Sequence, residues 1–384
     1  MINRFPKLRE KCTGCGACMS ICGQKAIVLE IDDEGFYYPA ISENKCVSCG
    51  LCAKVCPELK EKKESPASQE AYYGWHSDNS VRLKSSSGGV FSTFAESTIE
   101  EGGVVFGACF DDEYTRVSHC SSRDTDYEKF RKSKYVQSFT GDCFKKVLHE
   151  LESDKKVLFS GTPCQVSGLV SYLKRPYSNL VTCDFVCHGV PPSKLLNDHL
   201  NYIQKRTGKK ISSVDFRPKV LGWSNQTLKC TFAEGAEYVK IHTDDAYFTA
   251  FYENLSLRKC CYSCNYSENH HRSDITVADF WGYKSYDQSL NDEQGLSLVI
   301  ANTSKGKEVI GAAKSISLFP LEWMYAEYVY KKRNKESYSI EKRTDFFRYY
   351  LQHGWEKTIR AFKLEMKMIN RIKIRIKKKL FAQY

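Results

Sequence analysis

Short apolar runs alternate with amphipathic stretches from residue 71 onward. Short apolar runs predict buried strands, and stretches with apolar positions three or four residues apart predict helices. Helices are predicted over 90–98 and 193–205, the second with Ser193 as its N-cap. The predicted strands lie at 104–108, 157–160, 180–186, 274–278 and 296–300. Strands that alternate with helices are typical of an α/β body.

Two regions depart from this alternation. Over residues 211–243, strand-like segments follow one another with turns between them, which predicts a local antiparallel insert. Between Trp355 and Leu380, apolar residues recur at steps of three to four, with Ile372 filling one wider gap, among many Lys and Arg. This pattern predicts a basic amphipathic helix. Such a helix could lie on an anionic membrane surface or an acidic partner, or pack on the body with a solvated basic face.

The positive charge of the chain is concentrated in that same tail. Residues 331–384 hold 17 Lys and Arg against 5 Asp and Glu, a balance of +12, so the formal net charge of +11 leaves the rest at −1. A near-neutral body argues against nucleic-acid binding. The chain has no apolar run long enough for a membrane-spanning helix, and its first residues lack the apolar core of a signal peptide. We therefore expect a cytoplasmic protein, with peripheral membrane attachment through the tail left open.

The cysteines change this picture, because many of the 18 stand in C-x2-C groups. In a long chain without an export signal, this spacing indicates metal ligands rather than disulfides. The run C-x2-C-x2-C-x3-C occurs at 12–22 and again at 46–56. Three cysteines two residues apart wrap one [4Fe–4S] cube, and the fourth of each run reaches the other cube. One cluster would therefore be held by Cys12, Cys15, Cys18 and Cys56, and a second by Cys46, Cys49, Cys52 and Cys22.

The alternative to these clusters is a pair of zinc sites. Zinc-binding chains usually separate their C-x2-C pairs by longer loops, so a run of three cysteines fits a cube better. Pro57 follows Cys56 as in bacterial ferredoxins, whereas Gly23 stands where a proline would follow Cys22. With these motifs, residues 8–58 resemble the two-cluster bacterial ferredoxins. So many thiolates also suggest a reducing, anaerobic setting.

Four further cysteines stand beside predicted strand ends or in a C-x2-C pair: Cys164, Cys187, Cys261 and Cys264. Ligands bind at the carboxyl ends of strands in α/β sheets, so these thiols could converge on a third [4Fe–4S] cluster. Cys260 could replace Cys261. From spacing alone, a third cluster and ordinary buried cysteines remain equally open. The small, buried role is expected for Cys109, Cys120, Cys143, Cys183 and Cys230.

A specific series of segments runs through the body: SSGGVFS at 86–92, KYVQS at 134–138, GTPCQ at 161–165, DFVCHGVP at 184–191, the Cys261/Cys264 pair and SDITVADFWG at 273–282. In this order they resemble the beta-subunit family of coenzyme F420 hydrogenase and dehydrogenase, over residues 72 to about 305. The resemblance implies an FAD-containing iron–sulfur flavoprotein and a third cluster held by Cys164, Cys187, Cys261 and Cys264. It also implies electron exchange between clusters, flavin and a hydride-accepting or hydride-donating partner, without fixing the substrate.

The resemblance also indicates which residues could contact the flavin. The stretch from Lys84 to Gly89 precedes a predicted helix, where N–H groups and the lysine suit a diphosphate, although such Ser/Gly clusters are often plain turns. Asp279 and Trp281 could border the flavin ring or the cluster, or simply pack in the core. No G-x-G-x-x-G follows the first body strand, so no dedicated NAD domain is expected. The full predicted set is Lys84, Ser86, Ser87, Gly88, Gly89, Lys134, Tyr135, Gln137, Thr162, Asp279 and Trp281, and no catalytic residue is assigned.

We therefore expect an α+β ferredoxin-like N-terminal domain, an α/β flavoprotein body and a basic C-terminal helix. The expected boundaries are 1–59 for the two-cluster domain, 60–70 for a linker, 71–155 and 156–330 for two parts of the body, and 331–384 for the tail. The expected function is a flavin-dependent iron–sulfur oxidoreductase that connects a ferredoxin-type donor, or a partner redox subunit, with an organic substrate or coenzyme. Two alternatives remain: an electron-transfer subunit of a larger complex without its own substrate, and a non-redox protein recruited to a membrane or partner.

Overall fold

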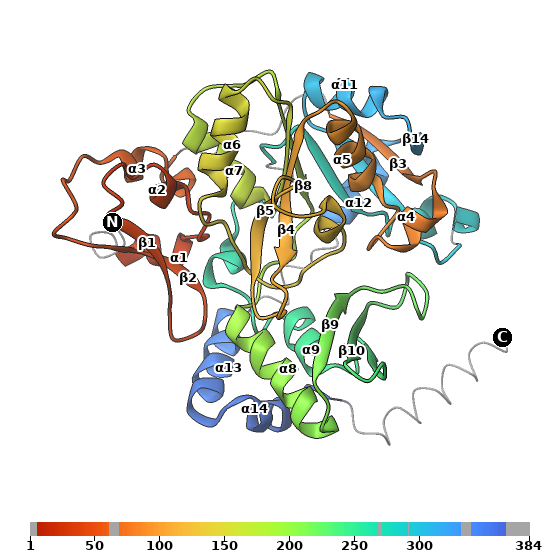
Figure 1. Cartoon of the computed structure of the whole chain (residues 1–384). Helices are drawn as coiled ribbons and strands as arrows, with labels where there is room; N and C mark the ends of the chain where they lie inside the picture. Colours follow the sequence, from red (N-terminus) through yellow and green to blue (C-terminus); the bar gives the residue numbers. More distant parts are fainter. Residues whose placement is uncertain (1–5, 61–68, 268–270, 291, 332–338, 366–384) are drawn as a thin grey trace.

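A nine-stranded mixed sheet forms the centre of the molecule in the computed structural model (Figure 1), which describes residues 6–60, 69–267, 271–290, 292–331 and 339–365. The strand order is β14-β3-β13-β12-β8-β7-β4-β5-β6. In that order the strands are Ile316–Leu321, Glu70–His76, Ser297–Ala301, Ile275–Asp279, Leu180–Phe185, Val157–Ser160, Val104–Phe110, Val117–Ser121 and Ser138–Phe139. The middle strands β12, β8, β7 and β4 run parallel, and antiparallel strands flank them.

Helices cover both faces of this sheet, because its strands alternate their side chains between two apolar cores. On β4, Val104 and Phe106 face a core that includes Phe144 and Leu169, from α6 (Cys143–Glu152) and α7 (Pro163–Leu173). Val105 faces the opposite core, which contains residues of α5 (Val90–Glu100) and α11 (Ser304–Ala312). The expected α/β body is confirmed. Four predicted strands agree with β7, β8, β12 and β13 within one residue, and the fifth, at 104–108, is β4, which continues to Phe110.

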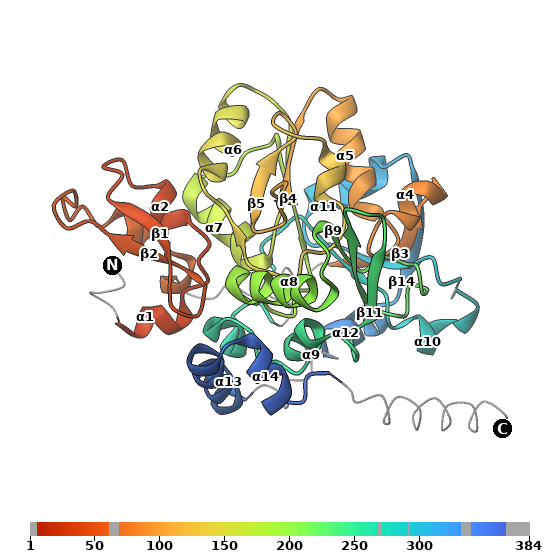
Figure 2. The same cartoon turned by 60° about the horizontal axis from the view of Figure 1, so that its bottom comes forward.

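The cysteine-rich N-terminal unit is small and packs beside α7 (Figures 1 and 2). Its only sheet within the described residues is a hairpin of β1 and β2, paired in antiparallel register. The hairpin residues Phe36 and Tyr38 enter the same apolar core as Phe347. The elements of this unit are α1 (Pro6–Lys11), α2 (Ala17–Ser20), β1 (Ile27–Ile31), β2 (Tyr37–Ile41), α3 (Leu51–Lys54) and the 3-10 helix η1 (Pro57–Leu59).

A third group of elements builds this core beneath the large sheet as Figure 1 is drawn. It contains the predicted antiparallel insert, a three-stranded sheet of β9 (Ile211–Phe216), β10 (Thr227–Phe232) and β11 (Glu237–Ile241). Its helices are α8 (Ser193–Thr207), α9 (Ala246–Tyr252), α13 (Ile340–His353) and α14 (Trp355–Ala361). The remaining elements are α4 (Asn79–Leu83), η2 (Tyr127–Phe130), η3 (Lys259–Ser263), α10 (Tyr283–Tyr286), η4 (Gln288–Leu290) and α12 (Trp323–Lys331).

Two details of the helices differ from the sequence predictions. Pro192, not Ser193, is the N-cap of α8, and no side chain caps that end. The helix predicted from Trp355 ends at Ala361, because Lys363 adopts a left-handed φ of 54° and turns Leu364 into the core. The predicted continuation through Met366 to Leu380 lies outside the described residues.

Candidate metal-cluster and cofactor site

The first predicted set of N-terminal cysteines surrounds one hollow. Cys12, Cys15, Cys18 and Cys56 all line a cavity of about 30 Å³, together with glycines of the same loop. Gly16 has a left-handed φ of 83° and starts the short helix α2, so the chain curls tightly between the second and third cysteines. The four side chains therefore occupy the walls of one small space, as a cube-shaped cluster requires.

The second predicted set repeats this local structure. Gly50 has a φ of 74° and starts α3, a helix of four residues like α2. Cys52 lies in α3 and interacts electrostatically with Cys18 of the first set. Cys22 accepts a hydrogen bond at its sulfur from the Ala26 amide (3.3 Å), and Cys49 is exposed. The internal repeat seen in the sequence is thus a repeat of structure.

The donor geometry bears on the choice between zinc and a cluster. In the part of the chain that the structure describes, no group of three or more His, Cys, Asp or Glu side chains could hold a single metal ion. Four thiolates around one zinc lie about 3.8 Å apart, because each Zn–S bond is about 2.3 Å long. Cysteines that line a hollow fit the larger [4Fe–4S] cube better than one ion.

The four body cysteines also meet at one cavity, of about 40 Å³. Cys164 lies at the start of α7, directly after β7, and Cys187 follows β8. Cys261 lies in η3 and Cys264 is its C-cap residue. Cys260 lines the same cavity, so both cysteines weighed for this position remain candidates. The convergence at strand ends agrees with the prediction, while the role of these residues as ligands stays a prediction.

The cavities of the first N-terminal set and of the body set adjoin each other. Thr13, between Cys12 and Cys15, lines both of them. Helix α7 brings Gly168 so close to Cys15 that a Cβ atom at Gly168 would lie 2.9 Å from the Cys15 sulfur. The Tyr37 amide of the hairpin donates to the Gln137 side chain of the body (3.0 Å). The N-terminal unit therefore contacts the body through the loop that holds its first cysteine set.

Burial keeps the thiols of Cys15, Cys56 and Cys164 neutral in the protein alone. It raises the pKa of Cys15 to about 12 and that of Cys56 to about 11, and it raises the pKa of Cys164 well above its usual range. A bound iron ion would reverse this, because a metal ion deprotonates a coordinating thiol. Without a metal, such buried thiols are poor nucleophiles.

Three of the predicted flavin contacts converge on Arg217, which sequence reasoning missed. The Arg217 guanidinium donates to both Asp279 oxygens (2.7 and 3.1 Å), to the Tyr135 hydroxyl (3.2 Å) and to the Ser86 carbonyl (3.4 Å). Trp281 stacks on Trp223 with a ring distance of 4.4 Å. Burial opposes the charge of Arg217, but the Asp279 carboxylate more than compensates and raises the arginine's pKa.

The loop at 84–89 makes several contacts within the fold. The Ser87 hydroxyl donates to the Leu296 carbonyl, and the Gly88 amide donates to the Ser297 hydroxyl. Gly88 lies so close to β3 that a Cβ atom there would be 2.5 Å from the Gly74 carbonyl oxygen. These contacts account for Ser87 and Gly88 as residues that position the loop, in line with the plain-turn interpretation. Gly89, with a left-handed φ of 88°, caps α5 without a side-chain contact.

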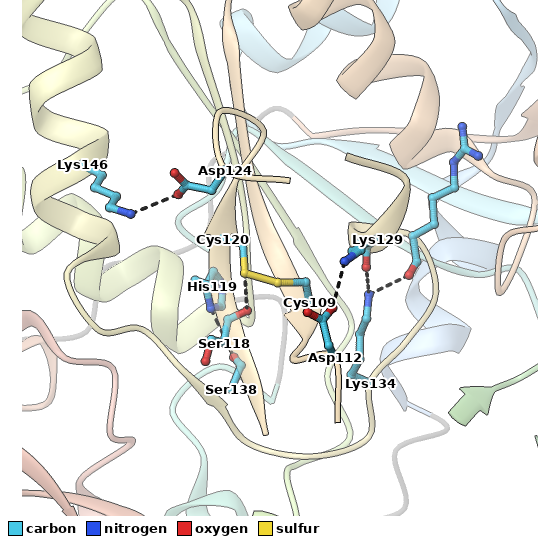
Figure 3. Close-up of a disulfide and its surroundings, with 11 residues drawn as sticks. Cys109, Asp112, Ser118, His119, Cys120, Asp124, Lys129, Lys134, Ser138 and Lys146 are labelled. Atoms are coloured by element: carbon cyan, nitrogen blue, oxygen red, sulfur yellow. Dashed lines mark hydrogen bonds and ion pairs between the residues drawn. A yellow bond between two sulfur atoms is a disulfide. The ribbon is translucent and has the colours of Figure 1, made fainter. Parts of the chain in front are cut away.

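Lys84 and Lys134 line a much larger cavity, of about 490 Å³, whose size is typical of cofactor sites. Its walls carry five basic residues, Lys84, Lys129, Arg131, Lys132 and Lys134, and four acidic ones, Asp111, Asp112, Glu128 and Asp215. The Lys134 ammonium donates to the carbonyls of Lys129 and Arg131, each at 2.7 Å (Figure 3), and burial lowers its pKa to about 7. Gln137 and Thr162 instead line the body cysteine cavity.

Figure 3 also shows a disulfide between Cys109 and Cys120, which corrects the prediction that both are simple buried hydrophobes. Cys109 lies on β4 and Cys120 on the antiparallel neighbour β5, with Cα atoms 6.3 Å apart. The pairing depends on strand register, which the spacing of the cysteines did not reveal. Arg217 and Arg258 were missed for a similar reason, although Arg258 stands immediately upstream of the body C-x2-C region.

The chain resembles known proteins in two regions. Residues 154–322 match the family described as the C terminus of the coenzyme F420 hydrogenase/dehydrogenase beta subunit, and residues 11–59 match the 4Fe–4S dicluster domain. The predicted resemblance is thereby confirmed. No curated protein is significantly similar to the chain.

Among solved structures, a chain of the F420-reducing [NiFe] hydrogenase complex from Methanosarcina barkeri is 16% identical, with a TM-score of 0.48. The match covers 74% of this chain and 94% of that one. Within the described residues, no helix is long and apolar enough to cross a membrane.

Proposed function

We propose that the chain is an iron–sulfur flavoprotein oxidoreductase. The proposal starts from the match of residues 154–322 to the C terminus of the coenzyme F420 hydrogenase/dehydrogenase beta subunit, and of residues 11–59 to the 4Fe–4S dicluster domain. It passes electrons between a ferredoxin-type donor and a hydride-accepting organic substrate or coenzyme. The direction of flow can be either way, since each carrier is reversible.

The observation that carries this proposal is the adjacency of the two cysteine cavities, which share Thr13 as a wall. Clusters held in these cavities would be near neighbours. A third cluster, held by Cys22, Cys46, Cys49 and Cys52, would lie next to the first, because Cys52 interacts with Cys18. The chain thus offers three one-electron carriers in a row, which is the arrangement that electron transfer needs.

A flavin would supply the conversion between single electrons and hydride, which clusters cannot perform. Two electrons from the clusters and one proton make one hydride equivalent. The large cavity beside Lys84 and Lys134 has room for a cofactor, and its lysines suit a diphosphate. The Arg217–Asp279 pair and Trp281 do not line this cavity, but Arg217 directly follows its lining residue Phe216, and the segment 134–138 connects the cavity with the cysteine cavity.

One observation favours a second candidate, an electron-transfer subunit that has no substrate of its own. Ser87 and Gly88 are engaged in holding their loop, so the predicted phosphate cradle is less open than the sequence suggests. In that case the clusters would deliver electrons to a partner redox subunit.

Quantification of iron, sulfide and flavin in one anaerobically purified sample distinguishes the two. The flavoprotein proposal expects about twelve irons and one FAD per chain. About twelve irons without flavin would favour the electron-transfer subunit. About eight irons without flavin would also refute the cluster at Cys164, Cys187, Cys261 and Cys264.

A further inference from the structure

Arg258 is a fully buried cation that lies between the two adjoining cysteine cavities. Its side chain is 0% exposed, and it lines the body cavity together with Cys164, Cys187 and Cys261. Its Nε donates to the backbone carbonyl of Cys12, at 2.7 Å, across the boundary between the N-terminal unit and the body. One guanidinium therefore touches the loop of one cysteine set and the cavity of the other.

The two terminal nitrogens of Arg258 have no hydrogen-bond partner within the described residues. The aromatic ring of Tyr38 lies 3.8 Å from the guanidinium carbon and offers a cation–π contact, but no carboxylate pairs with this charge in the described part of the chain. Burying the two terminal nitrogens of a charged group without hydrogen-bond acceptors costs free energy, so this arginine calls for an anionic partner. An arginine guanidinium stays protonated in proteins, so Arg258 carries its positive charge in this fully buried position.

We propose that Arg258 is a positioning residue whose fixed positive charge and free N–H groups act on the cluster of the body cavity. The inference rests on the proposed function, because it needs a cluster held by the body cysteines. A nearby positive charge stabilises the reduced cluster, which carries one more negative charge than the oxidised one. Hydrogen bonds and net charge are among the factors that set cluster potentials. Arg258 therefore raises the potential of the body cluster.

A purely structural role is the competing explanation, and Arg343 provides a matched comparison. Both arginines are buried and both lie over Phe36, with guanidinium carbons 5.5 and 5.9 Å from its ring. Arg343, however, is paired with the Glu34 carboxylate (2.7 Å) and does not line either cysteine cavity. Replacing each arginine with methionine therefore distinguishes the effect of losing a charge near the body cluster from the effect of losing packing on Phe36.

The test is a redox titration followed by electron paramagnetic resonance, on the full chain with its clusters loaded. The variants are Arg258→Met, Arg258→Gln, Arg258→Lys and Arg343→Met, and Cys164→Ser protein identifies the signal of the body cluster. The cluster of Cys22, Cys46, Cys49 and Cys52 serves as an internal reference. Arg258→Gln replaces Arg258→Met if the latter does not accumulate, because it removes the charge but keeps an amide donor.

Loss of the charge is expected to lower the reduced-to-oxidised ratio of the body cluster at least tenfold at fixed potential, which is 59 mV for one electron. Arg258→Lys should lower this ratio less, and Arg343→Met should leave the ratio unchanged. An unchanged potential in Arg258→Gln protein with full iron content would overturn the inference, as would an equal shift in Arg343→Met. Failure of the proposed function looks different, because iron or flavin would then be missing from the unsubstituted chain.

Discussion

At the scale of single residues, identical side chains have different roles according to what surrounds them. Cys15 and Cys143 are both buried in the same apolar core. Only Cys15 faces the small cavity shared with Cys12, Cys18 and Cys56. Burial alone therefore does not distinguish these two cysteines, whereas the shared hollow does.

Cys15→Ser is expected to remove about four irons per chain, because one cube loses a corner ligand. Cys143→Ser should retain the full iron content, since its thiol faces only apolar neighbours. Iron and sulfide counting on anaerobically purified variants checks both. Equal iron loss in the two variants would mean that Cys15 acts through packing.

Lys134 should make the binding of anions in the large cavity depend on pH. Burial holds the pKa of this lysine near 7, so its ammonium loses its proton as the pH rises from 6 to 8. Pyrophosphate itself becomes more negatively charged over this range, so the contribution of Lys134 is measured as the difference in affinity from Lys134→Met protein. This difference should shrink about tenfold, as one charged hydrogen bond is lost. The sign for stability is opposite: between about pH 7 and 10 the unfolded chain binds the proton that the folded chain does not, so stability rises with pH.

Titration calorimetry of pyrophosphate at several pH values measures this effect. Lys134→Met should remove the contribution of this lysine and leave only the pH dependence of the pyrophosphate itself. Lys129→Met is the matched control, because it removes an exposed lysine from the same cavity while leaving Lys134 and its carbonyl partners in place. The same pH dependence of affinity in the unsubstituted and Lys134→Met proteins would exclude Lys134 from the anion site.

At the scale of elements, the buried strands were predictable and the ends of helices were not. Strands β7 and β8 are apolar along most of their length because both of their faces are covered. The helix predicted from Trp355 is interrupted after Ala361, because periodicity carries no sign of the left-handed turn at Lys363. Cysteine spacing indicated which residues converge, but Arg217 and Arg258 reach their partners through tertiary packing and carry no local motif.

Helix α7 is the element that joins the two cysteine sets, and Gly168 allows its close approach. Gly168→Ala should destabilise the protein and lower its iron content, because the added methyl group meets the Cβ and sulfur of Cys15 at 2.9 Å. Gly311→Ala is the control in α11, where a Cβ meets nothing within 4 Å. There the higher helix propensity of alanine should stabilise by up to about 1 kcal/mol.

Thermal unfolding and iron counting on both glycine variants test this prediction. The expected result is a lower unfolding temperature for Gly168→Ala and an equal or higher one for Gly311→Ala. If both variants keep full iron and unfold together with the unsubstituted protein, α7 is not tightly packed on the cysteine loop.

At the scale of the whole molecule, the N-terminal unit and the body share a core and an ion pair. Phe36 and Tyr38 of the hairpin pack with Phe347 of α13, and Glu34 pairs with the buried Arg343 beside them. The expected boundary at residue 59 therefore stays a prediction, because packing continues across it.

Glu34→Gln should destabilise the protein by about 3 kcal/mol, because it leaves the buried Arg343 guanidinium without its anion. Arg9→Gln breaks the exposed Arg9–Asp32 pair on the same unit and should cost no more than about 1 kcal/mol. Thermal unfolding of both variants, together with hydrogen exchange of β1 and β2, compares the two losses of stability. Similar effects of the two substitutions would show that the unit is held mainly by its apolar contacts.

The packing around Thr13, which lines both cysteine cavities, affects from which side another protein could reach each cysteine set. The first N-terminal cysteine set faces inward, against α7 and the body, so no outside protein can approach it from that side. Cys49 of the other set is exposed. Under the proposed function, an external redox protein would therefore approach the second set at the exposed Cys49, rather than the first set on the side that packs against α7.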